Sequence, residues 1–278
     1  MYINEDNVYS EEYETTSYNV DWDYKANLNF IFSLIQDVGG THAYYRDCSV
    51  PQLQAENMTW VITRSAIEIM DYPTWPEKID VKTWAMKSKG YNAPRGTRIF
   101  NKKGDKLVEA LSYWAIIDFE KKRPIKPESI QQNQALTVNP DVKQYQVPLF
   151  KGKIKEFSPD LILMSSYEPS VFPSDSDYNG HTNNISYLNW MVNAFSQDFI
   201  KNRLARKVDI VWRKETHYTD SLRVSTYCLN PDSFNNVKST VETFQKIEII
   251  GKDGSKTVCS EAVITWENRN YFYPKDKD

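Results

Sequence analysis

The sequence is poor in cysteine and glycine, and it has no long apolar run. Its 3 cysteines, Cys48, Cys228 and Cys259, are too few and too scattered for a disulfide framework, which favours a reducing, cytoplasmic location. The 9 glycines form neither a G-x-G-x-x-G nor a G-x-x-x-x-G-K-S/T motif, so nucleotide binding of those kinds has no support. The longest apolar runs, such as residues 113–117, are too short to span a bilayer, and residues 1–6 show no start of a secretory signal.

The charges nearly balance, with 34 Lys and Arg against 37 Asp and Glu and a net charge of −3. An acidic total without a nucleic-acid-binding motif gives no support to a nucleic acid as partner. The distribution is uneven, because residues 1–24 contain seven acidic and no basic residues, whereas residues 82–126 contain twelve basic and four acidic ones. A smaller basic run comprises Lys201, Arg203, Arg206 and Lys207. These stretches predict either a docking surface for an acidic partner or exposed charges that keep the protein in solution.

Aromatic residues are abundant. The 8 Trp, 18 Tyr and 12 Phe make up 14% of the chain. Their side chains suit the half-buried, pleated surface of a β-sheet. Hydrophobic residues make up 40% and charged residues 26%, as in ordinary folded proteins. A globular protein with extensive β-structure is therefore expected.

The chain contains two copies of one plan. Residues 102–108 match residues 252–258, 150 positions later, and both are turn-like stretches with a central glycine that lead into a strand containing tryptophan. Trp60–Arg64 matches Ile210–Lys214, with the arginines 149 positions apart. A common offset near 150 and a common order indicate an internal duplication.

Each copy begins with a helical pattern. Apolar residues recur at helical spacing over residues 28–38 and again over 185–199, which predicts one amphipathic helix in each half. Asp23 and Asp177, 154 positions apart, each shortly precede one of these helices. Residues 39–40, both glycine, follow the first pattern and are expected to end or kink that helix.

Period-two alternation and short apolar runs predict antiparallel strands at residues 66–70, 79–84, 222–227, 248–250 and 261–266. Each half is therefore one long helix followed by a sheet that the helix covers, an α+β arrangement. Residues 131–155 lack periodicity and contain two prolines, so they are expected to link a domain at 1–130 to a domain at 156–278.

The richest set of polar groups lies just before the second helix. Asp177, Asn179 and His181 stand at i, i+2 and i+4, which puts a carboxylate, an amide and an imidazole on one side of an extended segment. The helix N-terminus that follows supplies backbone N–H groups suited to a developing oxyanion. These residues are candidates for catalysis, although Asp, Asn and Gly also form simple turns and caps before helices.

A second candidate group lies further along the chain. If the chain is extended there, Arg213, Glu215 and His217 share one face, and Glu215 could assist catalysis. The alternative is a simple ion pair between Arg213 and Glu215. A metal site built from Glu215 and the histidines of the chain, His42 and His181 among them, has no metal-binding spacing. Neither a metal nor another cofactor is therefore expected.

Ordered motifs run along most of the chain. The pattern D-x-N-x-H-x-N-N, followed by a tyrosine, comprises Asp177, Asn179, His181, Asn183, Asn184 and Tyr187. Further motifs lie at Trp212–Glu215, Trp60–Arg64, Tyr72–Trp75, Tyr113–Trp114 and Asp118–Pro124. From about residue 13 to about residue 266 the sequence resembles the acyl-ACP thioesterases, the plant and bacterial enzymes that release fatty acids from acyl carrier protein (ACP).

The resemblance implies a tandem (double) hotdog fold, in which two long helices are each wrapped by an antiparallel β-sheet. It implies that the catalytic groups are Asp177, Asn179, His181 and Glu215, all in the second half. It also implies hydrolysis of the acyl-ACP thioester, by attack of water or of Asp177, with release of a free fatty acid and the end of chain elongation. Plant members often have a cysteine after that glutamate, and Thr216 at this position excludes a cysteine nucleophile here.

The partners implied are acyl carrier protein bearing an acyl-phosphopantetheine group and the fatty acyl chain itself. By the same resemblance the first half lines the acyl pocket, with the first helix, Trp60 and Trp84 as candidates. Two other functions stay open, namely an acyl-CoA thioesterase on the same fold and a non-catalytic acyl-binding hotdog protein. Because a tandem hotdog contains its own pseudo-dimer, both a monomer and a homodimer fit the sequence.

Overall fold

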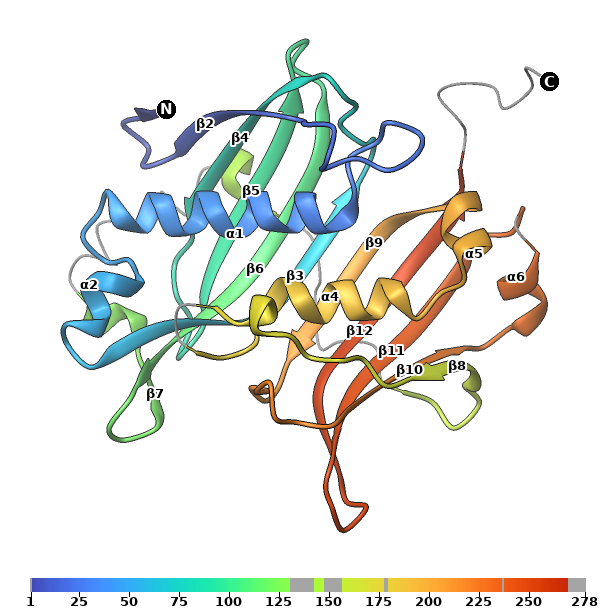
Figure 1. The fold of residues 1–278 in the computed structure, drawn as a ribbon. Coiled ribbons are helices and arrows are strands. Elements are labelled where there is room, and N and C mark those ends of the chain that lie inside the picture. Colours follow the sequence, from blue (N-terminus) through green and yellow to red (C-terminus); the bar gives the residue numbers. More distant parts are fainter. Residues whose placement is uncertain (1, 131–142, 148–156, 178–179, 237, 270–278) are drawn as a thin grey trace. The chain divides into compact units, whose positions relative to one another are not determined.

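The computed structural model describes residues 2–130, 143–147, 157–177, 180–236 and 238–269. By its internal contacts the chain divides into two compact units, residues 1–151 and 152–278. Each unit has its own set of antiparallel strands and its own helices (Figure 1). The linker expected at 131–155 lies mostly outside the described ranges, so the domain limits stay a prediction.

The sheet of the first unit has the strand order β1-β2-β4-β5-β6-β3, with β7 paired to β6. Its strands are β1 (Tyr2–Ile3), β2 (Tyr9–Glu14), β3 (Met58–Ile69), β4 (Lys78–Ala85), β5 (Ala93–Asn101), β6 (Lys106–Asp118) and β7 (Arg123–Ile125). Its helical segments are α1 (Leu28–Tyr44), α2 (Val50–Gln54), η1 (Pro127–Ser129) and η2 (Lys143–Tyr145). The strands predicted at 66–70 and 79–84 fall in β3 and β4.

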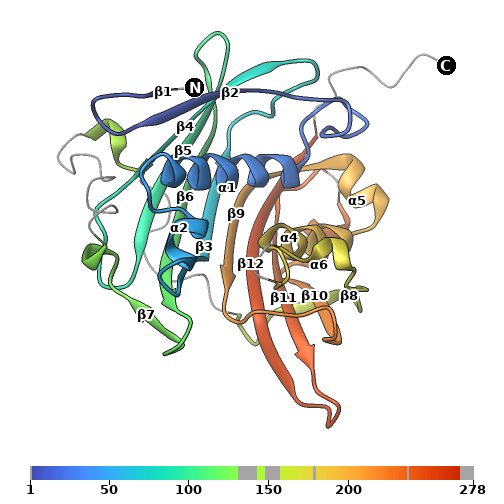
Figure 2. The same cartoon turned by 60° about the vertical axis from the view of Figure 1, so that its left-hand side comes forward.

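Helix α1 lies across one face of this sheet (Figure 1 and Figure 2). It begins after Asn27, whose side-chain oxygen accepts a hydrogen bond from the Phe30 N–H at 2.8 Å. The helix continues through Gly39 and Gly40, so the prediction that it ends there is wrong. A Cβ at Gly39 would lie 3.2 Å from Arg95 Cδ of β5. The glycine therefore reflects close packing between helix and sheet rather than a helix end.

Neighbouring residues of β4 and β5 point to opposite faces of the sheet. Arg95 points toward α1, because its Nη1 lies 3.1 Å from Nδ1 of His42 in that helix. Trp84 and Gly96, which pair directly across the two strands, therefore point to the other face. There the Trp84 indole N–H donates to the Tyr145 carbonyl oxygen at 2.8 Å. Trp84 thus faces away from α1, and its expected place in an acyl pocket stays a prediction.

The sheet of the second unit has the strand order β9-β12-β11-β10-β8. Its strands are β8 (Ile162–Tyr167), β9 (Arg203–Trp212), β10 (Leu222–Cys228), β11 (Val241–Ile250) and β12 (Lys256–Asn268). Its helical segments are η3 (Pro173–Asp175), α4 (Asn184–Asn193), α5 (Gln197–Asn202) and α6 (Pro231–Asn235). The strands predicted at 222–227, 248–250 and 261–266 fall in β10, β11 and β12. Among the described residues, none of the helices has the length and apolar character that crossing a bilayer requires.

The helical pattern predicted at 185–199 forms two helices rather than one. Helix α4 ends at Asn193, and Ser196 begins α5 by accepting a hydrogen bond from the Phe199 N–H at 3.1 Å. A serine that caps a new helix competes with continuation of the old one. Phe195 and Phe199 are both buried and their ring centroids lie 4.4 Å apart. The apolar spacing therefore reports burial, not one continuous helix.

The two units repeat the same order of strands and turns. Strands β6 and β12 have the same length and lie 150 positions apart, as the sequence comparison predicts. The turns before them contain Gly104 with a φ of 89° and Gly254 with a φ of 81°, a left-handed conformation that glycine adopts without strain. The predicted duplication is thus present in the backbone as well as in the sequence.

The same loop precedes α1 and α4, at an offset of 156 positions. In the first unit the Asp21 N–H donates to the Lys25 carbonyl at 2.8 Å, and in the second the Asp177 N–H donates to the His181 carbonyl, also at 2.8 Å. In both loops Oδ1 of the aspartate also accepts a hydrogen bond at 3.3 Å, from the Lys25 N–H in the first unit and from the His181 N–H in the second. Asp177 therefore matches Asp21, and its sequence-based match with Asp23 is wrong by two residues.

A buried arginine and a neutral histidine lie between α1 and the sheet. His42 is fully buried, and its ring stacks on Tyr9 with centroids 5.9 Å apart. Burial, together with the positive charges of Arg95 and Arg46, lowers the pKa of His42 to about 2. The imidazole is therefore neutral in the folded protein, and Arg95 donates to its unprotonated Nδ1.

The stability of the protein is expected to fall between about pH 7.5 and about pH 5.5 because of His42. In the unfolded chain this histidine has a pKa near 6.5 and takes up a proton, whereas in the folded protein it stays neutral. The free energy of unfolding should therefore drop by about 1.4 kcal/mol over this interval. Urea denaturation at both pH values measures this drop in the free energy of unfolding. In the His42→Gln variant the drop should be smaller by about 1.4 kcal/mol, because the variant has no histidine to protonate at this position. Equal drops in the two proteins would contradict a neutral His42.

Candidate active site

The loop before α4 contains two of the candidate residues, Asp177 and His181. The Gly180 N–H donates to the Asp177 carbonyl at 3.0 Å, and the His181 N–H lies 3.3 Å from Asp177 Oδ1. Gly180 has a φ of 74°, which residues with side chains rarely adopt. Asp177 therefore closes the turn that presents the imidazole. Asn179, the third candidate, lies outside the described residues.

His181 and Glu215 come together from two loops. His181 Nε2 is 3.4 Å from Glu215 Oε2, and the two side chains are 29% and 57% exposed. Strand β9 ends at Trp212, so Glu215 lies in the loop that follows, and the strand considered for residues 213–217 does not form. The His217 ring meets the His181 ring edge-on, with centroids 5.2 Å apart. The structure thus groups one carboxylate with two imidazoles.

Arg213 belongs to a different ion pair. Its guanidinium contacts the carboxylate of Glu261 in β12. Strands β9 and β12 pair here, with Trp212 opposite Ser260, which brings the arginine after β9 next to a residue of β12. The alternative ion pair between Arg213 and Glu215 is therefore wrong, and Glu215 contacts His181 instead.

A cluster of buried hydroxyl groups directly follows His181 and Glu215 in the sequence. The Thr182 N–H and the Thr182 hydroxyl both donate to the Thr216 carbonyl oxygen, each at 3.0 Å. Thr216 Oγ1 donates to Thr182 Oγ1 at 2.9 Å and lies 2.8 Å from the hydroxyl of Tyr187 in α4. Sequence reasoning missed this cluster, since it considered Tyr187 only as part of a motif and Thr216 only as the absence of a cysteine.

Some of the backbone N–H groups at the N-terminus of α4 are already used in the capping hydrogen bonds of that helix. Asn183 Oδ1 accepts the Ile185 N–H at 3.0 Å, and the Asn183 carbonyl accepts the Ser186 N–H, also at 3.0 Å. The Ser186 hydroxyl donates to Asp175 Oδ1 at 2.9 Å. An oxyanion at this helix would therefore need backbone N–H groups other than those of Ile185 and Ser186.

The cysteines do not provide a nucleophile. All three, Cys48, Cys228 and Cys259, are free and buried. Burial raises the pKa of Cys48 to about 11 and that of Cys259 to about 12, so both thiols stay protonated. Within the described ranges, no group of three or more His, Cys, Asp and Glu side chains is arranged to hold a metal ion.

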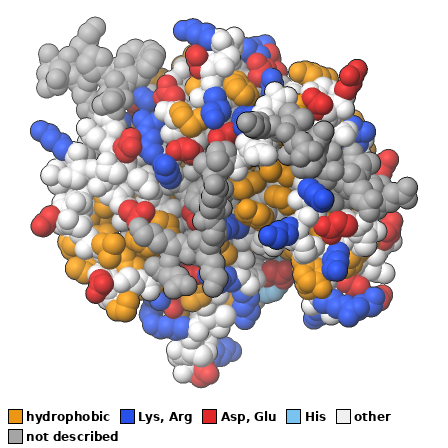
Figure 3. Space-filling view, turned by 180° about the vertical axis from the view of Figure 1, so that it is seen from behind, with side chains coloured by type: hydrophobic (Ala, Val, Ile, Leu, Met, Phe, Trp, Pro, Cys, Tyr) orange, Lys and Arg blue, Asp and Glu red, His pale blue; other side chains and the backbone are white. Residues whose placement is uncertain are grey.

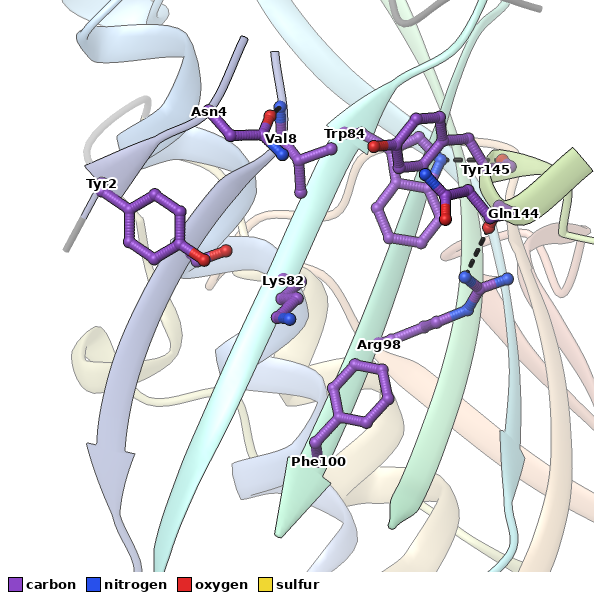
Figure 4. Close-up of a pocket in the computed structure, with 10 residues that line it drawn as sticks. Tyr2, Asn4, Val8, Lys82, Trp84, Arg98, Phe100, Gln144 and Tyr145 are labelled. Atoms are coloured by element: carbon purple, nitrogen blue, oxygen red, sulfur yellow. Dashed lines mark hydrogen bonds between the residues drawn. The ribbon is translucent and has the colours of Figure 1, made fainter. Parts of the chain in front are cut away.

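A pocket of about 230 Å³ lies on the face of the first unit's sheet that points away from α1 (Figure 4). The aromatic rings that line it are those of Tyr2, Trp84, Phe100 and Tyr145. Arg98 holds one wall in place, because its Nη1 donates to the Gln144 carbonyl at 2.5 Å. Trp84 therefore belongs to this outer pocket. The other expected pocket tryptophan, Trp60, donates instead to the Cys48 carbonyl at 2.7 Å, in the segment after α1.

The basic stretch at 82–126 is partly neutralised by acidic residues. Lys102 lies 2.6 Å from Glu12 of the acidic N-terminal segment, and Arg98 lies 2.6 Å from Glu109. The acidic and basic stretches of the sequence thus meet in the first unit. The excess of positive charge at its surface is therefore smaller than the count along the sequence indicates.

Two of the arginines counted as basic surface residues are buried. Arg95 packs against α1, and Arg203 donates to the carbonyl oxygens of Ser233, Phe234 and Asn236. On the face that Figure 3 presents, Lys and Arg side chains are interspersed with Asp and Glu side chains. A docking surface for an acidic partner would therefore draw on the exposed lysines and Arg123 of the stretch at 82–126, and not on Arg95.

Two family models match the chain. One is described as the acyl-ACP thioesterase N-terminal domain and matches residues 6–132, and the other as the acyl-ACP thioesterase C-terminal domain and matches residues 162–268. The oleoyl-acyl carrier protein thioesterase of Coriandrum sativum is 24% identical over 264 residues, which cover 91% of this chain and 69% of the relative. The chain spans 52% to 69% of the length of the Coriandrum sativum relative and of two relatives from Arabidopsis thaliana.

Solved structures have the same fold. The acyl-ACP thioesterase of Bacteroides thetaiotaomicron VPI-5482 gives a TM-score of 0.77 at 21% identity, covering 95% of this chain and 99% of that one. The 12:0-ACP thioesterase of Umbellularia californica gives 0.78 at 16% identity, covering 95% and 98%. These likenesses confirm the tandem hotdog fold. With one family model on each half and the expected motif at the start of α4, the chain belongs to the acyl-ACP thioesterase family.

Proposed function

We propose that the chain hydrolyses the thioester of acyl-ACP and releases a free fatty acid. The observation that carries the proposal is the contact of 3.4 Å between His181 Nε2 and Glu215 Oε2, in a chain whose two halves both match the family. An imidazole beside a carboxylate is the pairing that a general base uses. The proposed catalytic residues are Asp177, Asn179, His181 and Glu215.

Glu215 is proposed to orient the imidazole of His181. A neutral imidazole that directs its Nε2–H toward the carboxylate presents an acceptor at Nδ1. This nitrogen can take the proton of an attacking water and later give it to the departing thiolate of phosphopantetheine. The contact of 3.4 Å is expected to shorten when bound substrate excludes water from the site.

Asp177 is the second carboxylate of the site. Its Oδ1 holds the His181 N–H at 3.3 Å, as Asp21 holds the Lys25 N–H in the first unit. The loop geometry thus accounts for part of its role. Two routes are open for the chemistry, in which Asp177 either attacks the thioester carbonyl and forms an anhydride or deprotonates water. The pairing of His181 with Glu215 favours the water route.

Asn179 is proposed to polarise the thioester carbonyl together with backbone N–H groups near the start of α4. Its place between Asp177 and His181 in the sequence supports this role. The N–H groups of Asn183, Ile185 and Ser186 already donate within the chain, so these three are not assigned to the thioester carbonyl. Neither a metal nor an organic cofactor takes part in the proposed reaction.

The remaining proposals concern organisation and location. Residues 1–130 and 156–278 are proposed as the two hotdog halves, joined by a linker at 131–155. The carrier is acyl carrier protein bearing an acyl-phosphopantetheine group, and both a monomer and a homodimer fit this function. A cytoplasmic location is supported by three unbridged cysteines, because a reducing compartment keeps thiols free.

The experiment that tests the function compares acyl groups of several lengths on ACP and on CoA, at low and high salt. We expect kcat/KM for acyl-ACP to exceed that for the matched acyl-CoA by about tenfold or more. It should also fall as the salt concentration rises, because exposed charges steer the acidic carrier and salt screens them.

Other outcomes would favour the alternatives. Faster hydrolysis of acyl-CoA would indicate an acyl-CoA thioesterase, in which basic residues bind the phosphates of CoA. Tight binding of acyl-ACP without any hydrolysis would indicate an acyl-binding protein. A kcat/KM that does not change with salt would count against a basic docking surface.

A further inference from the structure

We propose that Thr182, Thr216 and Tyr187 form a positioning cluster that sets the geometry of the His181–Glu215 pair, an inference that rests on the function proposed above. Thr182 follows His181 in the chain, and Thr216 follows Glu215. The hydrogen bonds between the two threonines therefore hold together the two loops from which the imidazole and the carboxylate project. Tyr187 attaches this contact to helix α4.

The hydrogen bonds of the cluster run in one direction. The Thr182 hydroxyl donates its single proton to the Thr216 carbonyl at 3.0 Å, so toward the Thr216 hydroxyl it acts as acceptor. The Thr216 hydroxyl donates to it at 2.9 Å. With that proton used, Thr216 Oγ1 accepts from the Tyr187 hydroxyl, 2.8 Å away. Each of the three hydroxyl protons thus has one defined acceptor.

Burial gives this arrangement its rigidity. Thr216 is 0% exposed and Tyr187 is 2% exposed, so solvent cannot readily replace a lost partner. Burial also raises the pKa of Tyr187, which keeps the phenol protonated as a donor. Because the series of donors ends at a backbone carbonyl, it delivers no proton to His181. The cluster acts on the reaction through position alone.

The first unit contains the same loop without the hydroxyl groups. In the second unit the Thr182 N–H donates to the Thr216 carbonyl at 3.0 Å. In the first unit the Ala26 N–H, 156 positions earlier, donates to the Pro73 carbonyl at 2.7 Å. Ala26 therefore takes the place of Thr182, and Pro73 takes the place of Thr216. Neither replacement has a hydroxyl group.

The helix that follows shows the same difference. Ile31 of α1, fully buried, stands at the position of Tyr187 in α4. The loop and the start of the helix therefore fold without any of the three hydroxyls. A purely structural need would apply to both units, yet among the described residues the matched positions hold the cluster in the second unit, with the His181–Glu215 pair, and not in the first.

The test removes one hydroxyl without changing the size of the side chain. Thr216→Val removes it, and Thr216→Ser restores it. Thr243→Val is the matched control, because Thr243 is a fully buried threonine of β11 whose hydroxyl accepts the Trp266 indole N–H at 3.0 Å. We expect Thr216→Val to lower kcat for acyl-ACP about tenfold or more, with KM changed less than about threefold. Thr216→Ser should retain most of kcat, and Tyr187→Phe should behave as Thr216→Val does.

Two results would overturn the proposal: an unchanged kcat in Thr216→Val, or equal losses in Thr216→Val, Thr216→Ser and Thr243→Val. A wild type that hydrolyses no acyl-ACP would instead contradict the proposed function. The pH titration of the His181 ring protons by NMR then tests the cluster independently of activity. It should change in Thr216→Val and not in Thr243→Val, and an identical titration in both variants would also overturn the proposal.

Discussion

The Glu215→Gln variant is expected to hydrolyse acyl-ACP about a hundredfold more slowly than the wild type, with little change in KM. Glutamine keeps the size of the side chain but carries no negative charge. His181 Nε2, 3.4 Å from the carboxylate in the wild type, thereby loses the group that orients the imidazole and stabilises its protonated form. Steady-state kcat and KM on a single acyl-ACP measure the effect.

Glu168→Gln is the matched control for this experiment. Glu168 is also an exposed partner of a cation, since it is 64% exposed and lies 2.8 Å from Arg223 on β10. Its replacement should leave kcat within about twofold. His181→Ala should lose at least as much activity as Glu215→Gln, and the double variant little more, because groups that act as a unit are not additive. A wild-type kcat in Glu215→Gln would remove the pair from the mechanism.

The Asp23→Ala variant is expected to lower the free energy of unfolding by about 3–5 kcal/mol. Asp23 Oδ2 lies 2.6 Å from Lys25 Nζ, and the side chains are 2% and 9% exposed. Removal of the carboxylate leaves the ammonium group buried without this counter-charge, which is far more costly than the loss of an ion pair in water. Urea denaturation followed by circular dichroism measures the loss.

Two further variants define what this loss means. Glu267→Gln removes a partner of an exposed pair, in which Arg206 Nε lies 3.2 Å from a carboxylate that is 50% exposed, and should cost less than about 1 kcal/mol. Combining Asp23→Leu with Lys25→Met removes both buried charges and should recover most of the stability. If Asp23→Ala costs no more than Glu267→Gln, the Asp23–Lys25 pair is effectively solvated.

The strands and the duplication could be predicted because both depend on patterns that are local in the sequence. Strands β6 and β12 each follow a turn with a central glycine, Gly104 or Gly254, and these two turns lie 150 positions apart in the sequence. The motif before α4 is also contiguous, so it located Asp177 and His181 at one loop. Local patterns were sufficient wherever the structure depends on neighbours in the chain.

The failures concern choices made between distant or competing partners. The apolar spacing at 185–199 reports which residues are buried, but not that Ser196 caps a second helix. Arg213 has acidic residues within reach both along the chain and across the sheet, and the pairing of β9 with β12 selects Glu261 over Glu215. The hydroxyl cluster joins three segments, so no short pattern in the sequence could indicate it.

The burial of every cysteine makes the folded chain suitable for site-specific labelling. Maleimide dyes react with thiolates, and the native thiols are both enclosed and kept protonated by their surroundings. A cysteine introduced at Tyr218, which is 68% exposed in the loop after Glu215, would therefore be the one group that reacts. A fluorophore at that point could test whether the proposed acyl carrier binds near Glu215, without removal of any natural cysteine.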